Sequence, residues 1–138
     1  MIAEPETDIG CQLRSDHDIA ASRQLVRKMS QDLGFSLVDQ TKLVTATSEL
    51  ARNTVKYGGG GEMRVEQVRR GAELGLKVTF VDQGPGIADI QKAMSEGWSS
   101  GSGLGLGLSG SKRLVNDFDI ESRPGEGTRV TITRWRRI

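Results

Sequence analysis

Two polar residues four positions apart, Glu49 and Asn53, are the first candidates for chemistry in this sequence. They lie in a stretch with helical periodicity, and residues four apart on a helix share one face. A carboxylate there could act as a general base, and an amide oxygen is a ligand that Mg²⁺ accepts. A solvated polar face with an ordinary contact between turns would explain the same pair. This helix alone leaves both interpretations open.

A glycine-rich run forms the second candidate. Gly103, Gly105 and Gly107 alternate with leucines, and helical spacing begins at about Ser109. Glycines let backbone N–H groups approach an anion closely, and a helix N-terminus adds roughly half a positive charge. The run is therefore interpreted as a phosphate cradle. A flexible linker is the alternative, but leucines that alternate with glycines favour packing over free movement.

Two well-known phosphate-binding motifs do not fit this run. Gly105, Gly107 and Gly110 have the spacing of a dinucleotide-binding loop, yet the preceding residues, 95–102, are polar and lack strand character. A P-loop needs a lysine directly after its last glycine, where this chain has Ser111, with Lys112 one place late. The sequence therefore excludes both motifs.

Asp82 ends an apolar, strand-like segment and precedes two glycines, Gly84 and Gly86, that flank a proline. An aspartate here commonly starts a turn, which is a sufficient explanation by itself. Alternatively, its carboxylate lies at the floor of a pocket and accepts a hydrogen bond from an exocyclic amine, while the glycines let backbone approach a flat ring. Thr128 follows a Gly-Glu-Gly turn and is, by itself, an ordinary β-branched strand residue.

The elements that must position these residues are helices and strands in succession. Capping signals at Ser15 and Asp18 predict a first helix that ends at Gly34, and a second helix runs from near Asp39 to Tyr57. The predicted strands are 9–13, 63–68, 74–81, 119–122 and 128–135, with a short helix at 90–94 and a last helix from Ser109 that includes Phe118. This order predicts an α+β fold, a two-layer sandwich in which helices back a mixed, mostly antiparallel sheet.

Composition narrows the function classes. The chain has 138 residues, which predicts one domain, and its formal net charge of +1 gives no electrostatic reason to expect a nucleic-acid or membrane partner. The single cysteine, Cys11, suits a reduced, cytoplasmic setting, and no apolar segment is long enough to span a bilayer. The basic C-terminal end, with Arg134, Arg136 and Arg137, is interpreted as a solvated tail.

Four segments, taken in chain order, resemble the sequence boxes of the GHKL (Bergerat-fold) ATP-binding superfamily. They are E-L-A-R-N, D-Q-G-P-G, G-L-G-L-G and G-E-G-T, and the match spans roughly residues 9–135. The longer segments S-E-L-A-R-N-T-V-K-Y and G-L-S-G-S-K-R-L look closest to small bacterial anti-sigma serine kinases, in particular the RsbT-type switch kinases of the stressosome. The resemblance implies a single GHKL-type ATP-binding kinase domain over residues 1–138.

The resemblance also implies a role for each candidate residue. Glu49 would be the general base on the acceptor hydroxyl, and Asn53 would chelate a Mg²⁺ ion that bridges the phosphates of ATP. Asp82 would bind the adenine amine, with Thr128 beside it. The residues that would shape the pocket and wrap the phosphates are Gly84, Gly86, Gly103, Leu104, Gly105, Leu106 and Gly107.

A lid over the ATP, from about Ala93 to Ser102, is implied as well, and it departs from the family pattern. Related kinases often carry an arginine shortly before the second glycine box, where it reaches the terminal phosphate. This chain has no cation between Ser99 and Ser102, and the next ones are Lys112 and Arg113. A slow kinase, or one completed by its partner, would be consistent with that difference.

The partners implied by the resemblance are proteins. The substrate would be a STAS-domain antagonist protein, and the released kinase would activate a PP2C-type phosphatase that leads to a general stress response. Two alternatives stay open: an anti-sigma factor that sequesters a sigma subunit, and a non-catalytic, nucleotide-gated binding module, which the missing lid cation favours.

Overall fold

Helices and strands follow one another closely along the chain. The computed structural model describes residues 8–95 and 107–136. Its strands are β1 (Asp8–Leu13), β2 (Gly61–Arg70), β3 (Glu73–Asp82), β4 (Asp117–Ser122) and β5 (Thr128–Trp135). Its helices are α1 (Asp16–Asp32), α2 (Leu37–Lys56), α3 (Ile90–Ala93) and α4 (Gly107–Arg113).

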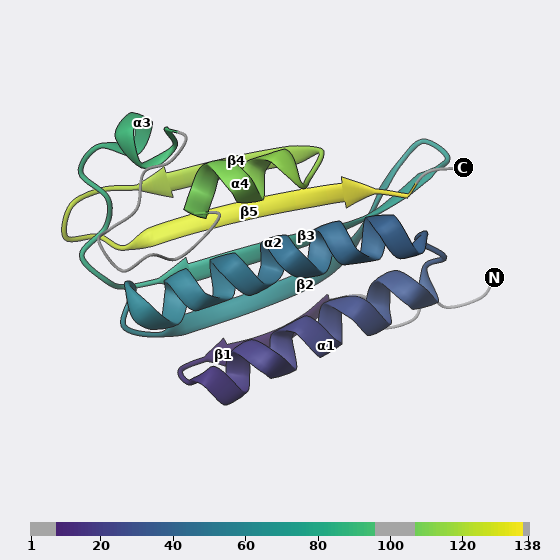
Figure 1. The fold of residues 1–138 in the computed structure, drawn as a ribbon, viewed down its shortest axis with the longest axis horizontal. Coiled ribbons are helices and arrows are strands. Elements are labelled where there is room, and N and C mark those ends of the chain that lie inside the picture. Colours follow the sequence, from purple (N-terminus) through teal and green to yellow (C-terminus); the bar gives the residue numbers. More distant parts are fainter. Residues whose placement is uncertain (1–7, 96–106, 137–138) are drawn as a thin grey trace.

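The strands form one five-stranded sheet in the order β1-β2-β3-β5-β4. Every pairing between neighbouring strands is antiparallel, so the described sheet is antiparallel rather than mixed. Helices α1, α2 and α4 lie side by side over one face of the sheet (Figure 1). The predicted α+β sandwich of one sheet and one helical layer is confirmed.

Local signals explain where the long helices begin. The Ser15 hydroxyl accepts a hydrogen bond from the backbone N–H of Asp18 at the start of α1. Ser36 does the same for Asp39 at the start of α2, with a donor–acceptor distance of 3.1 Å. Each cap satisfies a backbone donor that the helix itself leaves without a partner. The helices therefore start where the sequence provides caps.

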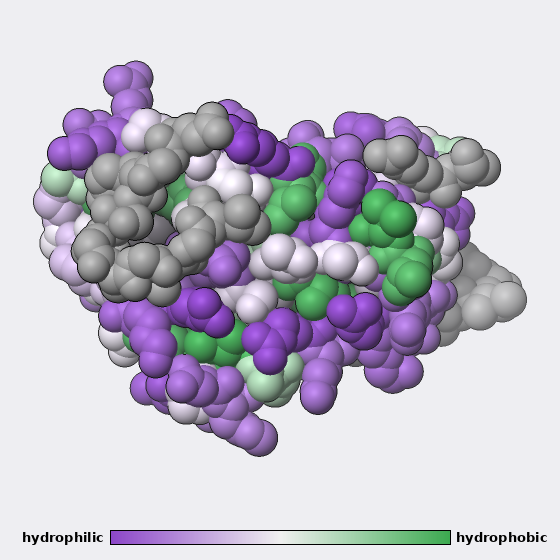
Figure 2. Space-filling view, in the orientation of Figure 1, coloured by the Kyte–Doolittle hydropathy of each residue, from purple (hydrophilic) through white to green (hydrophobic). Residues whose placement is uncertain are grey.

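The core lies between the two layers. The side chains that fill it come from one stripe of each long helix and from alternate positions of the central strands. Apolar patches interrupt the mainly hydrophilic outer face of the helical layer (Figure 2). Among the described helices, none has both the length and the apolar character needed to cross a bilayer. The largest fully buried apolar side chains are Leu13, Leu43, Leu50, Met63, Leu76, Phe80 and Ile132.

The last helix is shorter than predicted. Helix α4 ends at Arg113, and Asn116 already donates its backbone N–H to the carbonyl of Thr133 on β5. Phe118 lies in β4, opposite Ile132. The spacing of Leu108, Val115 and Phe118 fits a helix, but Phe118 and Ile120 also fit the two-residue period of a strand. Pairing with β5 decides in favour of the strand, so the helical prediction for this segment is wrong.

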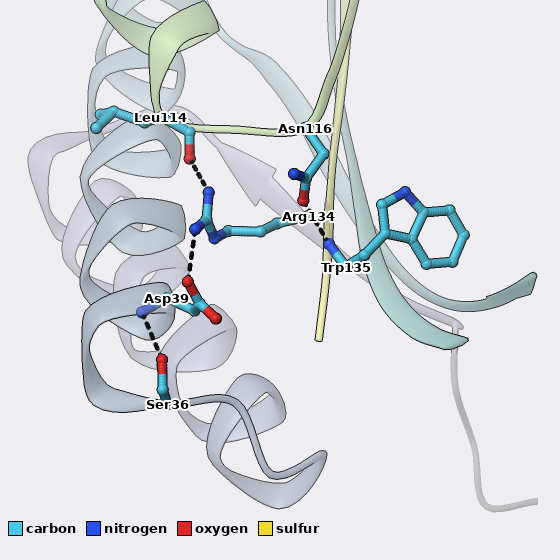
Figure 3. A network of polar contacts seen from close by, with 6 residues as sticks. All are labelled: Ser36, Asp39, Leu114, Asn116, Arg134 and Trp135. Atoms are coloured by element: carbon cyan, nitrogen blue, oxygen red, sulfur yellow. Dashed lines mark hydrogen bonds and ion pairs between the residues drawn. The ribbon is translucent and has the colours of Figure 1, made fainter. Parts of the chain in front are cut away.

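The basic C-terminal end is not a solvated tail. Only 4% of the Arg134 surface is exposed. Its guanidinium donates to Asp39 Oδ1 at 2.5 Å and to the carbonyl of Leu114 at 2.8 Å (Figure 3). Arg136 donates to the carbonyl of Leu33. The prediction is wrong for both residues: Arg134 occupies a buried position of β5, and Arg136, directly after the strand, also donates its backbone N–H to the carbonyl of Leu74 at 2.8 Å. Arg137 lies outside the described residues.

Candidate active site

One end of the sheet brings together residues that are far apart in the sequence. Asp82, the last residue of β3, pairs with Gly61 at the start of β2 and with Thr128 at the start of β5. Thr128 pairs in turn with Ser122, the last residue of β4. Because the register fixes these neighbours, Asp82 and Thr128 lie next to each other as the resemblance requires.

Glycine residues allow the C-terminal end of α2 to pack directly against the strand end at Asp82. A Cβ atom built on Gly58 would lie 2.4 Å from Cγ of Asp82, and one built on Gly84 would lie 2.8 Å from Cα of Gly58. Gly58 also donates its N–H to the carbonyl of Asn53 at 3.1 Å. The turn that carries Asn53 is therefore in direct contact with the Asp82 region. Sequence reasoning treated Gly58 only as a helix stop, although the four consecutive glycines were a signal of close approach.

The Asp82 carboxylate is held in place and almost buried. Its Oδ1 atom accepts a hydrogen bond from the backbone N–H of Gly84 at 2.9 Å, and only 9% of the residue is exposed. This contact is the predicted aspartate-initiated turn. It occupies one carboxylate oxygen and leaves Oδ2 to accept a hydrogen bond from a ligand. The turn therefore supports a binding role for Asp82 rather than competing with it.

Ser122, at the end of β4, was not singled out from the sequence, yet its hydroxyl takes part in three hydrogen bonds beside Thr128. Its hydroxyl accepts from the backbone N–H of Ile87 at 2.7 Å and donates to the carbonyl of Gly127 at 3.0 Å. It also lies 2.8 Å from the Thr128 hydroxyl. Since a serine hydroxyl has one proton, which goes to Gly127, Thr128 must donate to Ser122. Toward a ligand, Thr128 is then left as an acceptor, like Asp82.

A cavity of about 480 Å³ lies at this end of β3, β4 and β5. Asp82 and Thr128 line it, together with Ser122. Glu49 and Asn53 do not belong to its lining. The described residues thus form two neighbouring parts, a cavity at the sheet end and a polar face on α2, and Gly58 connects them.

Glu49 and Asn53 lie on α2, and both are partly buried. One carboxylate oxygen of Glu49, Oε2, is fully buried and makes no hydrogen bond within the described part of the chain. Burial raises the pKa of the Glu49 carboxyl above its ordinary value of 4.5, and the charge of Arg52 partly offsets that shift. Buried polar atoms normally have partners, and within the described residues atoms of Gln40, Thr47 and Arg134 also make no hydrogen bond. Glu49 differs from them in its raised pKa and in its position one helical turn from Asn53, and this combination points to a function for Glu49.

The remaining predicted residues lie in three described places or outside the described ranges. Gly86 has a φ of +76°, and a Cβ on it would lie 2.0 Å from the carbonyl oxygen of Arg123, so only glycine fits. Gly107 begins α4, at the end of α4 that lies toward the C-terminus of α2 (Figure 1). Ala93, expected at the start of the lid, is buried in α3. The predicted residues outside the described ranges are Gly103, Leu104, Gly105 and Leu106, with most of the lid.

The arrangement fits a nucleotide better than an all-protein metal site. Within residues 8–95 and 107–136, no three histidine, cysteine, aspartate or glutamate side chains gather into a possible metal site. A Mg²⁺ ion would therefore depend on the Asn53 oxygen and on phosphates, which is a common arrangement for Mg²⁺. The buried Asp82 carboxylate, the glycine contacts around it and the unpartnered Glu49 oxygen fit a bound nucleotide.

Gly58→Ala should lower the affinity for ATP by about tenfold or more, because the new methyl group must displace the Asp82 carboxylate. Nucleotide titration by calorimetry measures the effect. Gly59→Asn is the matched control, since Gly59 has a φ of +74° that asparagine tolerates and no atom within 4 Å of an added Cβ. Equal affinities for wild type and Gly58→Ala would contradict the placement of Asp82 in the site.

Comparisons with known proteins agree with this geometry. Residues 38–137 match the family model described as histidine kinase-, DNA gyrase B-, and HSP90-like ATPase. The chain is 47% identical over 125 residues to the serine/threonine-protein kinase RsbT of Bacillus subtilis. This match covers 91% of this chain and 94% of the relative. It is 26% identical over 119 residues to an anti-sigma F factor of Thermoanaerobacter, covering 83% of this chain and 82% of that protein.

A solved structure shows the same fold. The RsbU and RsbW domains of Rv1364c from Mycobacterium tuberculosis match with a TM-score of 0.63 and 22% identity, over 97% of this chain and 34% of that one. The chain therefore belongs to the histidine kinase-, DNA gyrase B- and HSP90-like ATPase family and, within it, is a protein serine/threonine kinase of the RsbT type.

Proposed function

We propose that this kinase transfers the terminal phosphoryl group of ATP to a serine or threonine of a STAS-domain antagonist protein, with Glu49 as the general base. The observation that carries the proposal is the buried, unpartnered Oε2 atom of Glu49, one helical turn from Asn53. The carboxylate accepts the proton of the acceptor hydroxyl while that oxygen forms its bond to phosphorus. ATP supplies the phosphoryl group, and ADP leaves. The protein's part is to position the groups and to hold the base.

Nucleotide choice follows from the acceptors at the sheet end. Asp82 Oδ2 and the Thr128 hydroxyl oxygen both present lone pairs, as argued from their hydrogen bonds. The exocyclic amine of adenine donates hydrogen bonds, whereas guanine has a carbonyl at the equivalent position. The guanine carbonyl oxygen would face these two hydrogen-bond acceptors and could form no hydrogen bond with either. We therefore propose ATP, rather than GTP, as the nucleotide.

Asn53 is proposed as the one protein ligand of Mg²⁺, and Asn53→Ala tests it. The variant should lose the increase in ATP affinity that Mg²⁺ gives, because no carboxylate cluster in the described residues can replace the amide oxygen. Titrations of ATP with Mg²⁺ and with EDTA measure that difference. The expected loss is about 10–100-fold in the presence of the metal and little without it. An unchanged Mg²⁺ effect would remove Asn53 from the metal site.

The partner steps are proposed as a switch in the cytoplasm. After phosphorylating the STAS-domain protein, the kinase is released and activates a PP2C-type phosphatase that starts the stress response. Similarity to a serine/threonine-protein kinase RsbT over almost the full length of both chains supports this reading. The test is incubation of the kinase with γ-labelled ATP, Mg²⁺ and the STAS-domain protein. Label on a serine or threonine of that protein is expected, and its absence would contradict the proposal.

Sequestration of a sigma subunit is the second candidate, favoured by the similarity to an anti-sigma F factor. Parallel pull-downs with a sigma factor and a STAS-domain protein separate the two functions. The first proposal predicts capture of the STAS-domain protein alone. Capture of the sigma factor, with displacement by the STAS-domain protein, would favour the second.

A further inference from the structure

The start of α2 exposes two adjacent apolar side chains. Leu37 is 71% exposed and Val38 is 62% exposed. They stand in the first turn of the helix, after the cap residue Ser36. The first turn favours acidic side chains, so helix formation gives no reason for leucine and valine at this point. In Figure 2 apolar surface is visible toward the right of the view, where α2 begins in Figure 1.

Within residues 8–95 and 107–136, Leu37 and Val38 belong neither to the buried core nor to the apolar side chains packed against it. Phe35, before the cap, is instead part of the buried core and only 4% exposed, and the Gln40 amide donates to the Phe35 carbonyl at 2.9 Å. Leu37 and Val38 are therefore available to a partner.

A basic residue borders the apolar pair on α2, because Lys42 lies one turn after Val38. A second basic residue, Lys112, is exposed on α4, which packs beside α2. The end of α4 is tied to the start of α2 through Arg134, which donates to the Leu114 carbonyl and to Asp39 (Figure 3). Asp39 is buried against Arg134, so its charge is not available at the surface. We call Leu37, Val38 and Lys42 the α2 patch.

The charge of the α2 patch selects the kind of partner. Besides the buried Asp39, the acidic residue of α2 and α4 is Glu49, whereas their basic residues are Lys42, Arg52, Lys112, Arg113 and Lys56. Lys56, at the far end of α2, forms an ion pair with Asp16 of α1. At the edge of the sheet, β4 instead exposes Asp117, Asp119 and Glu121. An acidic protein surface with an apolar centre would be attracted to the α2 patch and repelled from β4.

We propose that the α2 patch docks the protein substrate, through an acidic surface of that substrate with an apolar residue at its centre. This proposal rests on the kinase activity toward a STAS-domain protein proposed above. Val38 and Glu49 are eleven residues apart on one helix, which is about 16 Å along its axis. That span is smaller than a small domain, so one folded partner can cover the patch while its hydroxyl reaches Glu49.

The test variant is Leu37→Glu with Val38→Glu. Glutamate in a first turn is favourable to the helix, so the variant should fold, and its thermal transition checks this. With the STAS-domain protein as substrate, we expect KM and the dissociation constant to rise by about 10–100-fold, with kcat and ATP affinity unchanged. Lys42→Glu should raise KM by severalfold at low salt and less at high salt. Lys28→Glu, on the exposed surface of α1, is the control and should behave as wild type.

Each outcome of this test supports or overturns the docking proposal, the kinase proposal or both. If wild type phosphorylates the substrate but the double variant binds it equally well, docking at the α2 patch is wrong and the kinase proposal stands. If wild type neither binds nor phosphorylates the STAS-domain protein, both proposals fall. If the double variant keeps its substrate affinity but changes the oligomeric state seen by sedimentation, the patch contacts a second copy and the docking proposal is overturned.

Discussion

Glu49→Gln should lower the rate of phosphotransfer by about 10²–10⁴-fold while ATP binds almost as before. The amide has the same shape as the carboxylate but cannot accept the proton of the acceptor hydroxyl. No hydrogen bond of Oε2 is lost, because this atom makes none within the described part of the chain. Single-turnover transfer to the STAS-domain protein, with ATP affinity measured in parallel, checks both parts. Glu62→Gln, on the exposed side of β2, is the control.

The same residue predicts a pH dependence. Glu49 must be deprotonated to act as a base, and burial raises its pKa above the ordinary value of 4.5. Phosphotransfer should therefore fall as the pH drops through this raised pKa, at a higher pH than for an exposed glutamate. Arg52 lowers the pKa, so Arg52→Gln should move the acidic limb of the rate profile to higher pH. An identical profile in Arg52→Gln, or a wild-type rate in Glu49→Gln, would refute the assigned base.

The strand ends that carry Asp82 and Thr128 could be predicted from the sequence, because apolar alternation marks each strand, whereas their nearness was implied only by the family resemblance. The apolar alternation ending at Asp82 and the turn before Thr128 place both residues at strand ends, and antiparallel pairing makes them neighbours. Glu49 and Asn53 needed only the helical repeat. Their distance from Asp82 could not be predicted, because it depends on the glycine contacts between Gly58 and Asp82.

The wrong and missed predictions arise from contacts between residues that are far apart in the sequence. Phe118 satisfies both a helical and a strand period, and only pairing with Ile132 settles its structure. Ser122 bonds to Ile87, 35 residues away, and nothing in its local sequence indicates that contact. The partner of Arg134, Asp39, is 95 residues away, so the basic C-terminal end resembled a surface tail. Long-range polar contacts leave no periodic pattern in the sequence.

Arg134→Met should destabilise the protein by about 3–5 kcal/mol, because it leaves the Asp39 carboxylate buried without the guanidinium. The side chains of Arg134 and Asp39 are 5% and 2% exposed, so solvent cannot replace the lost partner. The substitution also removes the donor to the Leu114 carbonyl, which anchors the end of α4 (Figure 3). Since domains have a free energy of unfolding of about 5–15 kcal/mol, this loss should be large in a urea titration.

Two further variants show how much of the expected destabilisation by Arg134→Met comes from the buried charge and how much from the loss of side-chain volume. Arg134→Met combined with Asp39→Leu removes both charges and should recover most of the stability, because an apolar pair needs no ionic partner. Lys28→Met breaks an ion pair with Asp32 in which both side chains are largely exposed, 76% and 64%, and should change the free energy of unfolding by less than about 0.5 kcal/mol. If the double variant were as unstable as Arg134→Met alone, packing around Arg134 and its bond to Leu114, rather than the loss of the guanidinium beside the Asp39 carboxylate, would explain the loss.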